Sequence, residues 1–255
     1  MGEIVKVKNA SYARYEEVLL RRDNLRKEAE QYHLAFIREF GDLIERSFEL
    51  KVECIKKKKE IGFCQKLANQ GKTIRRSELL NYIESVMKEY YDELKSIIGD
   101  VELARSSSSI SPVEVRKIKS LYYSLAKLIH PDMHPEFAGD EILEDYWQRI
   151  CIAYQHNCLE DMTELDAMVR MYLQSNYDGR TSVEIENIDQ KISMVEKEIE
   201  EIISTNPYLY RIMLGSEAAI RDKRREYEDE IEAYRKYSAQ LDDVLETFDI
   251  EEMLS

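Results

Sequence analysis

The chain has 255 residues, of which 51 are acidic and 37 basic, and its formal net charge at pH 7 is −14. Nucleic acids and anionic lipid surfaces attract basic proteins, so we expect neither as a partner. Only 8 Gly and 4 Pro occur, too few for the many tight turns of a β-sandwich, propeller or barrel. Hydrophobic residues make up 44% of the chain, and this composition favours an all-α fold with long helices.

In residues 11–40, apolar residues recur at alternating spacings of three and four, which predicts a coiled-coil seam. Arg22 fills one slot of this seam. Its apolar members are Tyr15, Val18, Leu25, Ala29, Tyr32 and Phe36. We expect Gly41 to interrupt the helix, and two further helices to follow over residues 43–67 and 76–98.

A polar linker, Ser106–Ser109, separates this N-terminal arm from a central segment. There the periodicity predicts a helix over residues 113–129, which Pro131 stops because proline cannot continue a helix. Two more helices are expected over residues 141–155 and 161–173.

Beyond Tyr177-Asp178-Gly179 the heptad pattern becomes strict and is broken once, at Asn206-Pro207. The seam residues before the break are Ile185, Ile188, Ile192, Val195, Ile199 and Ile202. Those after it are Ile220, Arg224, Tyr227, Ile231, Tyr234, Ser238, Leu241, Leu245 and Phe248. Two heptad helices joined at a proline corner predict an antiparallel hairpin, with pairing to a second copy of the chain as the alternative. No strand is predicted.

The expected organisation is therefore an N-terminal helical arm over 1–105, a central domain over 106–178 and a coiled-coil hairpin over 179–255. No apolar run is long enough to span a membrane, and the first residues lack the apolar core of a secretory signal. Cys54, Cys64, Cys151 and Cys158 have no CxxC spacing. We interpret them as reduced thiols of a cytoplasmic protein, and expect neither a metal site nor a cofactor.

The central segment carries the most informative motif, His130-Pro131-Asp132, between a helix rich in basic residues and a helix that begins with acidic ones. Tyr122, Leu125 and Ala126 precede the tripeptide, and Trp147, Ile150, Ala153 and Tyr154 follow it. This arrangement resembles the J domain of the DnaJ co-chaperone family, including the Tyr-x-x-Leu-Ala pattern of its second helix and the aromatic-x-x-Ile-x-x-Ala-Tyr pattern of its third. Tyr123 and Ser124 stand where that family usually has two basic residues.

The resemblance implies binding to a DnaK-type chaperone and stimulation of its ATPase. It assigns His130, Pro131 and Asp132 as the trigger, with Arg116, Lys119, Tyr122 and Lys127 as the docking face. Helical spacing predicts that Leu121, Leu125 and Leu128 pack against Trp147, Ile150 and Tyr154 to form the hairpin. Without a Gly/Phe-rich stretch or a zinc region, the chain resembles the third, heterogeneous class of J proteins, whose additional regions set the location or client.

Two other functions are compatible with the sequence. The chain could be a coiled-coil scaffold or adaptor that keeps a J-like fold without stimulating a chaperone. A more distant alternative is a metal-dependent enzyme, but we expect no enzymatic activity because the sequence has no phosphate-binding GxxxxGK[ST] loop and no evident nucleophile. The sequence leaves open the client, and whether the coiled-coil arms pair within one chain or between two.

Overall fold

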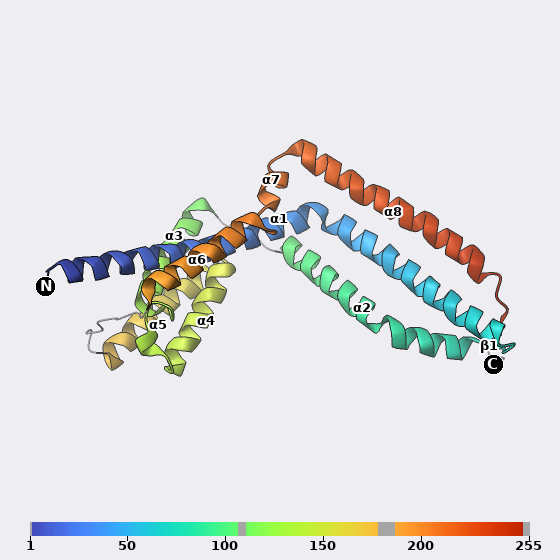
Figure 1. Cartoon of the computed structure of the whole chain (residues 1–255), viewed down its shortest axis with the longest axis horizontal. Helices are drawn as coiled ribbons and strands as arrows, with labels where there is room; N and C mark the ends of the chain where they lie inside the picture. Colours follow the sequence, from blue (N-terminus) through green and yellow to red (C-terminus); the bar gives the residue numbers. More distant parts are fainter. Residues whose placement is uncertain (1, 107–110, 178–186, 252–255) are drawn as a thin grey trace. The chain divides into compact units, whose positions relative to one another are not determined.

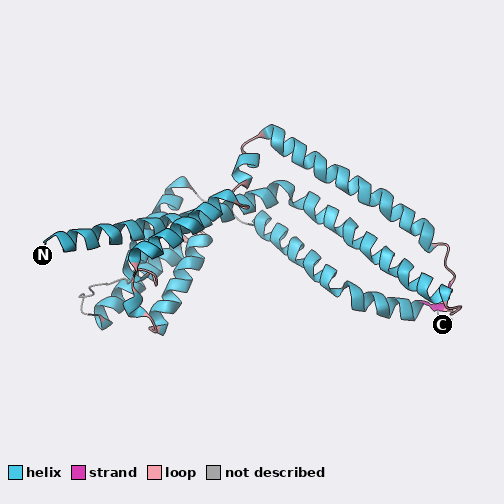
Figure 2. Ribbon diagram, in the orientation of Figure 1, coloured by secondary structure: helices cyan, strands magenta, loops and turns pink. Residues whose placement is uncertain are grey.

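The computed structural model describes the backbone of residues 2–106, 111–177 and 187–251. These residues form an all-α fold, as expected (Figures 1 and 2). The helices are α1 Gly2–Asn69, α2 Arg76–Ser106, α3 Pro112–Ile129, α4 Glu141–Gln155, α5 Leu159–Asn176, α6 Ile188–Ser204, α7 Tyr210–Leu214 and α8 Glu217–Leu245. A 3-10 turn, Pro135–Phe137, lies between α3 and α4, and two short strands are β1 Ile74–Arg75 and β2 Ile250–Glu251.

The chain forms two compact units, and neither is continuous in sequence. Unit 1 contains residues 1–33 and 108–209, and unit 2 contains residues 34–107 and 210–255. This division differs from the three consecutive segments expected, because α1 contributes its first part to one unit and its second part to the other. Most of the Ser106–Ser109 linker, the Asp178-Gly179 boundary and Ile185 lie outside the described residues.

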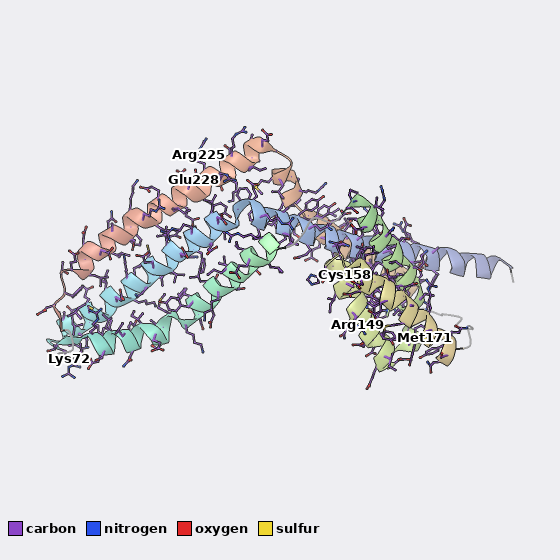
Figure 3. All side chains as sticks on the ribbon, turned by 180° about the vertical axis from the view of Figure 1, so that it is seen from behind. Lys72, Arg149, Cys158, Met171, Arg225 and Glu228 are labelled. Atoms are coloured by element: carbon purple, nitrogen blue, oxygen red, sulfur yellow. The ribbon has the colours of Figure 1, made fainter. Side chains whose placement is uncertain are left out.

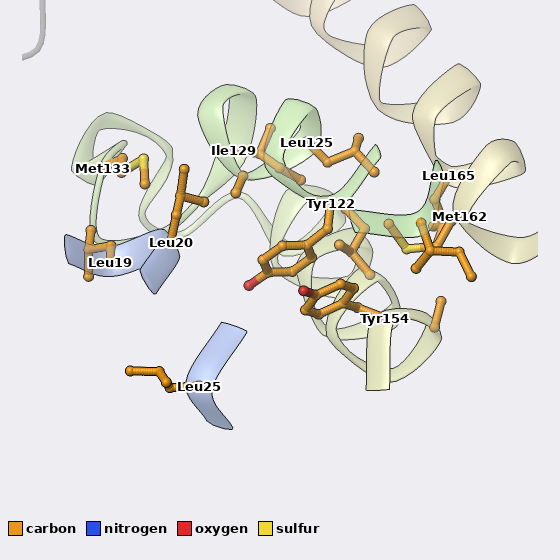
Figure 4. Close-up of a cluster of buried hydrophobic side chains, with 14 of the residues drawn as sticks. Leu19, Leu20, Leu25, Tyr122, Leu125, Ile129, Met133, Tyr154, Met162 and Leu165 are labelled. Carbon is orange, nitrogen blue, oxygen red and sulfur yellow. The ribbon is translucent and has the colours of Figure 1, made fainter. Parts of the chain in front are cut away.

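Unit 1 is built on a hairpin of α3 and α4. Tyr122 stacks on Tyr154 with ring centroids 3.9 Å apart, and His130 lies 4.6 Å from Trp147, so the two helices run antiparallel. Helix α5 packs against both, and the first part of α1 and helix α6 complete the core (Figure 1). Its fully buried side chains include Leu19, Ile118, Leu125, Met133, Ile150, Met162, Leu165 and Val169, some of which appear in Figure 4.

In unit 2 the second part of α1 packs with α2 and α8 (Figure 1). The rings of Phe63 on α1 and Tyr82 on α2 stack with centroids 4.9 Å apart. Exposed residues of α8 such as Arg225 and Glu228 lie on the side away from α1 (Figure 3). The strands β1 and β2, which the sequence did not predict, form a parallel pair in which Ile74 lies opposite Ile250.

The heptad helices α6 and α8 use different partners. Helix α6 buries Val195 and Ile199 in the core of unit 1, whereas α8 lies in unit 2, where the Cys54 thiol donates to the Tyr234 carbonyl at 3.5 Å. Instead of forming the expected hairpin with each other, the two helices each pack against a part of α1.

Gly41 and Gly99 lie inside α1 and α2, where a break and a helix end were expected. At Gly41 the reason is packing between helices. A Cβ atom at this position would lie 3.0 Å from Cγ2 of Val101, so any larger residue would have to push the Val101 side chain aside, and glycine allows α2 to approach this closely. Gly41 therefore permits the close contact with Val101 of α2, and α1 continues through it.

The four cysteines differ between the units. Cys54 and Cys64 of unit 2 are buried, and Cys151 and Cys158 of unit 1 are partly buried; all four are free thiols. No helix in the described residues has a long enough apolar stretch to cross a lipid bilayer.

The role of Gly41 predicts that Gly41→Leu lowers the free energy of unfolding by about 2 kcal/mol, because the larger side chain overpacks the contact with Val101. Urea unfolding followed by circular dichroism measures this loss. Gly62→Leu is the matched control: Gly62 lies in the same helix, and a Cβ atom there would meet no other atom within 4 Å, so we expect this variant to be neutral or stabilising. Equal losses in both variants would contradict the packing role.

Candidate functional site

The helices around the tripeptide have well-defined ends. Ser111 caps α3 in a reciprocal capping box with Glu114, and Pro112 occupies the first turn. His130 ends α3, donating its backbone N–H to the Ala126 carbonyl at 2.9 Å. Helix α4 begins at the N-cap Asp140, which accepts from the backbone N–H groups of its first turn. These local signals place the tripeptide in the loop between α3 and α4.

Both ring nitrogens of His130 are engaged. The backbone N–H of Asp132 donates to Nδ1 of His130 at 3.0 Å, so in the neutral ring the proton lies on Nε2. Nε2 faces Oδ2 of Asp23 on α1 at 3.4 Å. With a residue exposure of 3%, His130 is buried. It therefore fixes the loop and is not free to act as a general base.

Asp132, in contrast, is open to solvent, with 47% of its side chain exposed. Its carboxylate lies 3.5 Å from Nη1 of Arg22, which itself has only 10% of its side chain exposed. Arg22 also pairs with Asp23 at 2.9 Å and with Glu198 of α6 at 3.6 Å. One guanidinium thus connects the tripeptide to two other elements of unit 1.

Asp23 is the central acceptor on α1. Besides facing His130, it accepts a hydrogen bond from the Tyr122 hydroxyl at 2.9 Å. Burial acts to raise the pKa of Asp23, but the hydrogen bond from His130 and the charge of Arg22 outweigh it and hold that pKa below its ordinary value. Burial raises the pKa of the Tyr122 hydroxyl, so Tyr122 stays a neutral donor.

Tyr122, assigned to the docking face, is therefore covered by α1. Only 2% of the residue is exposed. Figure 4 shows the Tyr122 and Tyr154 rings side by side, with their hydroxyls turned toward the α1 segment of Leu20 and Leu25, and with Met162 on the other side.

The basic residues of the predicted docking face are more accessible. Arg116 is exposed, and Lys119 is half-buried with its ammonium 5.6 Å from the Tyr123 ring. Lys127 has 53% of its side chain exposed and pairs with Glu16 of α1 at 2.6 Å. Helix α1 thus covers Tyr122 of this face and contacts Lys127, and it also covers His130 of the tripeptide.

A guanidinium from α5 reaches the position where the family has a second basic residue. Arg170 donates from Nη2 to the Ser124 hydroxyl at 2.8 Å and is held by Asp166 one turn earlier. Its side chain is 51% exposed. The sequence pattern of α3 alone gave no signal for this contribution.

The residues predicted for the hairpin core lie in one apolar cluster of unit 1. Leu125, Ile150 and Tyr154 are buried, and Leu121, Leu128 and Trp147 pack against them while partly buried. In the described part of the chain, no three His, Cys, Asp or Glu residues are grouped so that they could hold a metal ion.

Sequence reasoning missed the polar α1 residues that contact the hairpin, apart from noting Arg22 as a polar seam member. The most unusual of them is Lys27, whose ammonium is buried without a hydrogen-bond acceptor and lies 3.7 Å from the centre of the Tyr154 ring. Burial and the nearby charge of Lys119 lower the pKa of Lys27 to about 8. The cation–π contact of the Lys27 ammonium with the Tyr154 ring compensates only in part for the hydration that the ammonium loses on burial.

Comparison with known proteins gives no relative: no protein-family model, no curated protein and no solved structure matches the chain. The resemblance to the J domain therefore rests on the sequence motifs around the tripeptide.

The buried ammonium predicts that Lys27→Met raises the free energy of unfolding at pH 7 by about 1 kcal/mol, since an apolar side chain needs no hydration. Between the folded pKa of about 8 and the unfolded value of 10.5, the unfolded chain binds more protons, so wild-type stability rises with pH there. The advantage of the variant should consequently shrink from pH 7 to pH 9.5. Urea unfolding at both pH values measures it.

Lys117→Met, at an exposed position of α3, is the control and should show no such dependence on pH. A destabilised Lys27→Met variant at pH 7 would contradict the cost assigned to the buried charge.

Proposed function

We propose that the chain is a J-type co-chaperone that binds a DnaK-type chaperone and stimulates its ATPase. The observation that carries this proposal is the His130-Pro131-Asp132 loop at the tip of an antiparallel hairpin, where the Asp132 backbone N–H bonds to His130 and the Asp132 carboxylate is half exposed. Pro131 restricts the backbone, so little conformational entropy is lost when a partner binds the loop. The ATP chemistry belongs to the partner.

The charge distribution supports docking along α3. Arg116 and Lys117 are exposed on this helix, and Lys127 lies near its end, in a protein whose net charge is −14. A local basic surface on an acidic protein steers association toward an acidic patch of the partner and raises the association rate. We place the protein in the cytoplasm, where free thiols such as those of its four cysteines stay reduced.

In this proposal, unit 1 binds the chaperone. Unit 2, with its helices α2 and α8 on the second part of α1, is then the region that recognises a client or a second copy of the chain. This assignment follows the third class of J proteins, whose additional regions set the client.

The test is single-turnover ATP hydrolysis by the DnaK-type chaperone of the same organism, with and without this protein. We expect Asp132→Asn to abolish stimulation, while its stability changes by less than about 1 kcal/mol because the carboxylate is half exposed. Asp145→Asn is the matched control, since Asp145 is exposed on α4 and, among the described residues, its ion pair is with Arg149 of the same helix. Stimulation that persists in Asp132→Asn, or that is absent in the folded wild type, would refute the proposal.

A second candidate is an adaptor that uses the J-like hairpin only as a structural element. The burial of His130 and its contact with Asp23 favour this alternative, because they give the tripeptide an internal role. The two functions differ in the effect of Asp132→Asn: an adaptor tolerates it, because the exposed carboxylate contributes little to stability.

A further inference from the structure

In unit 1, helix α1 covers part of the proposed docking face. From Glu16 to Lys27, α1 places one charged or polar side chain after another on hairpin residues. Glu16 meets Lys127, Arg22 meets Asp132, and Asp23 meets both His130 and Tyr122. Asn24 accepts from the Tyr154 hydroxyl at 3.4 Å. These contacts include members of both the trigger and the docking face.

The surface between α1 and the hairpin also has an apolar part. Val18, Leu19, Leu20 and Leu25 are buried in the common core of unit 1. This part makes the covered arrangement the major state, because lifting α1 exposes apolar surface to water.

One polar group of α1 works in the opposite direction. Ions lose hydration when they are buried, and their mutual attraction repays this loss only when the geometry and the remaining hydrogen bonds are good. The guanidinium of Arg22 has such partners, since it lies 2.9 Å from Asp23 and 3.5 Å from Asp132, whereas the buried ammonium of Lys27 has no hydrogen-bond acceptor. Lys27 is thus a built-in cost of the covered state, which is removed when α1 lifts.

We infer that residues 15–29 of α1 act as an internal lid on the docking face, so that the free chain is held in a weakly stimulating state. This inference rests on the proposed function. A chaperone that needs Tyr122 and His130 gains them only when the lid opens, so its apparent affinity is its intrinsic affinity multiplied by the fraction of molecules that are open. Opening exposes the face without a change in the α3–α4 hairpin itself.

Two variants of α1 should move stimulation in opposite directions. Arg22→Gln removes the charge that pairs with Asp132, so the lid opens more often and stimulation rises by about fivefold. Lys27→Met removes the buried ammonium, so the lid closes more firmly and stimulation falls by about twofold. Arg26→Gln is the matched control: Arg26 is one turn from Arg22 and pairs with Glu198 but not with the tripeptide, and stimulation should stay at the wild-type level.

Hydrogen exchange of the backbone amides of residues 15–29, measured without the chaperone, reports directly how often the lid opens. We expect faster exchange in Arg22→Gln than in wild type or Arg26→Gln, and slower exchange in Lys27→Met. This readout remains informative even if Arg22→Gln weakens unit 1, because Lys27→Met is expected to stabilise it.

The outcomes separate the lid from the proposed function. Wild-type stimulation that neither Arg22→Gln nor Lys27→Met changes would overturn the lid and leave the co-chaperone proposal in place. Stimulation that rises in Arg22→Gln and is lost again in Arg22→Gln/Asp132→Asn would support both. Altered exchange in the predicted directions, with no stimulation by any variant, would support the lid and refute the co-chaperone activity.

Discussion

A helix of 68 residues cannot bury its own apolar side chains, and this requirement decides where the other helices of the chain lie. The first part of α1 buries Tyr15, Val18 and Leu19 in the core that contains the α3–α4 hairpin. The second part buries Val52 and Cys64 with residues of α2. One helix is therefore a structural member of two cores, which explains why neither compact unit is continuous in sequence.

The features that could be predicted are those with local causes. A capping residue, a proline after the last turn and a regular apolar spacing define α3, and a capping residue and the same kind of spacing define α4. The choice of the helix against which another helix packs has no such local signal. A heptad seam shows that one face of a helix is apolar but not which helix covers it, so the seams of α6 and α8 predict a pair when each helix packs on α1. The prediction at Gly41 is wrong for the same reason, since its function depends on Val101, sixty positions away.

The polar members of the apolar seams explain why the contacts of α1 with the proposed docking face could not be predicted. Arg22, Arg224 and Ser238 each stand in a heptad slot, and each meets charged groups: Arg224 pairs with Glu39, and Ser238 accepts from Lys57 and donates to Glu53. The partners of Arg22 include Asp132, more than a hundred residues away. Its position in the seam marks it as unusual, but only the fold shows that it contacts the tripeptide. Asp23, beside it, belongs to no pattern at all.

The distribution of the cysteines gives the protein its own conformational reporters. Burial raises the pKa of the Cys54 and Cys64 thiols in unit 2, and raises that of Cys151 in unit 1 to about 11. The thiolate is the form that reacts with alkylating reagents, so each of these sulfurs reacts slowly until its surroundings open. Because the two units contain different cysteines, the order in which these residues are alkylated, read by mass spectrometry, shows which unit opens first without any engineered label.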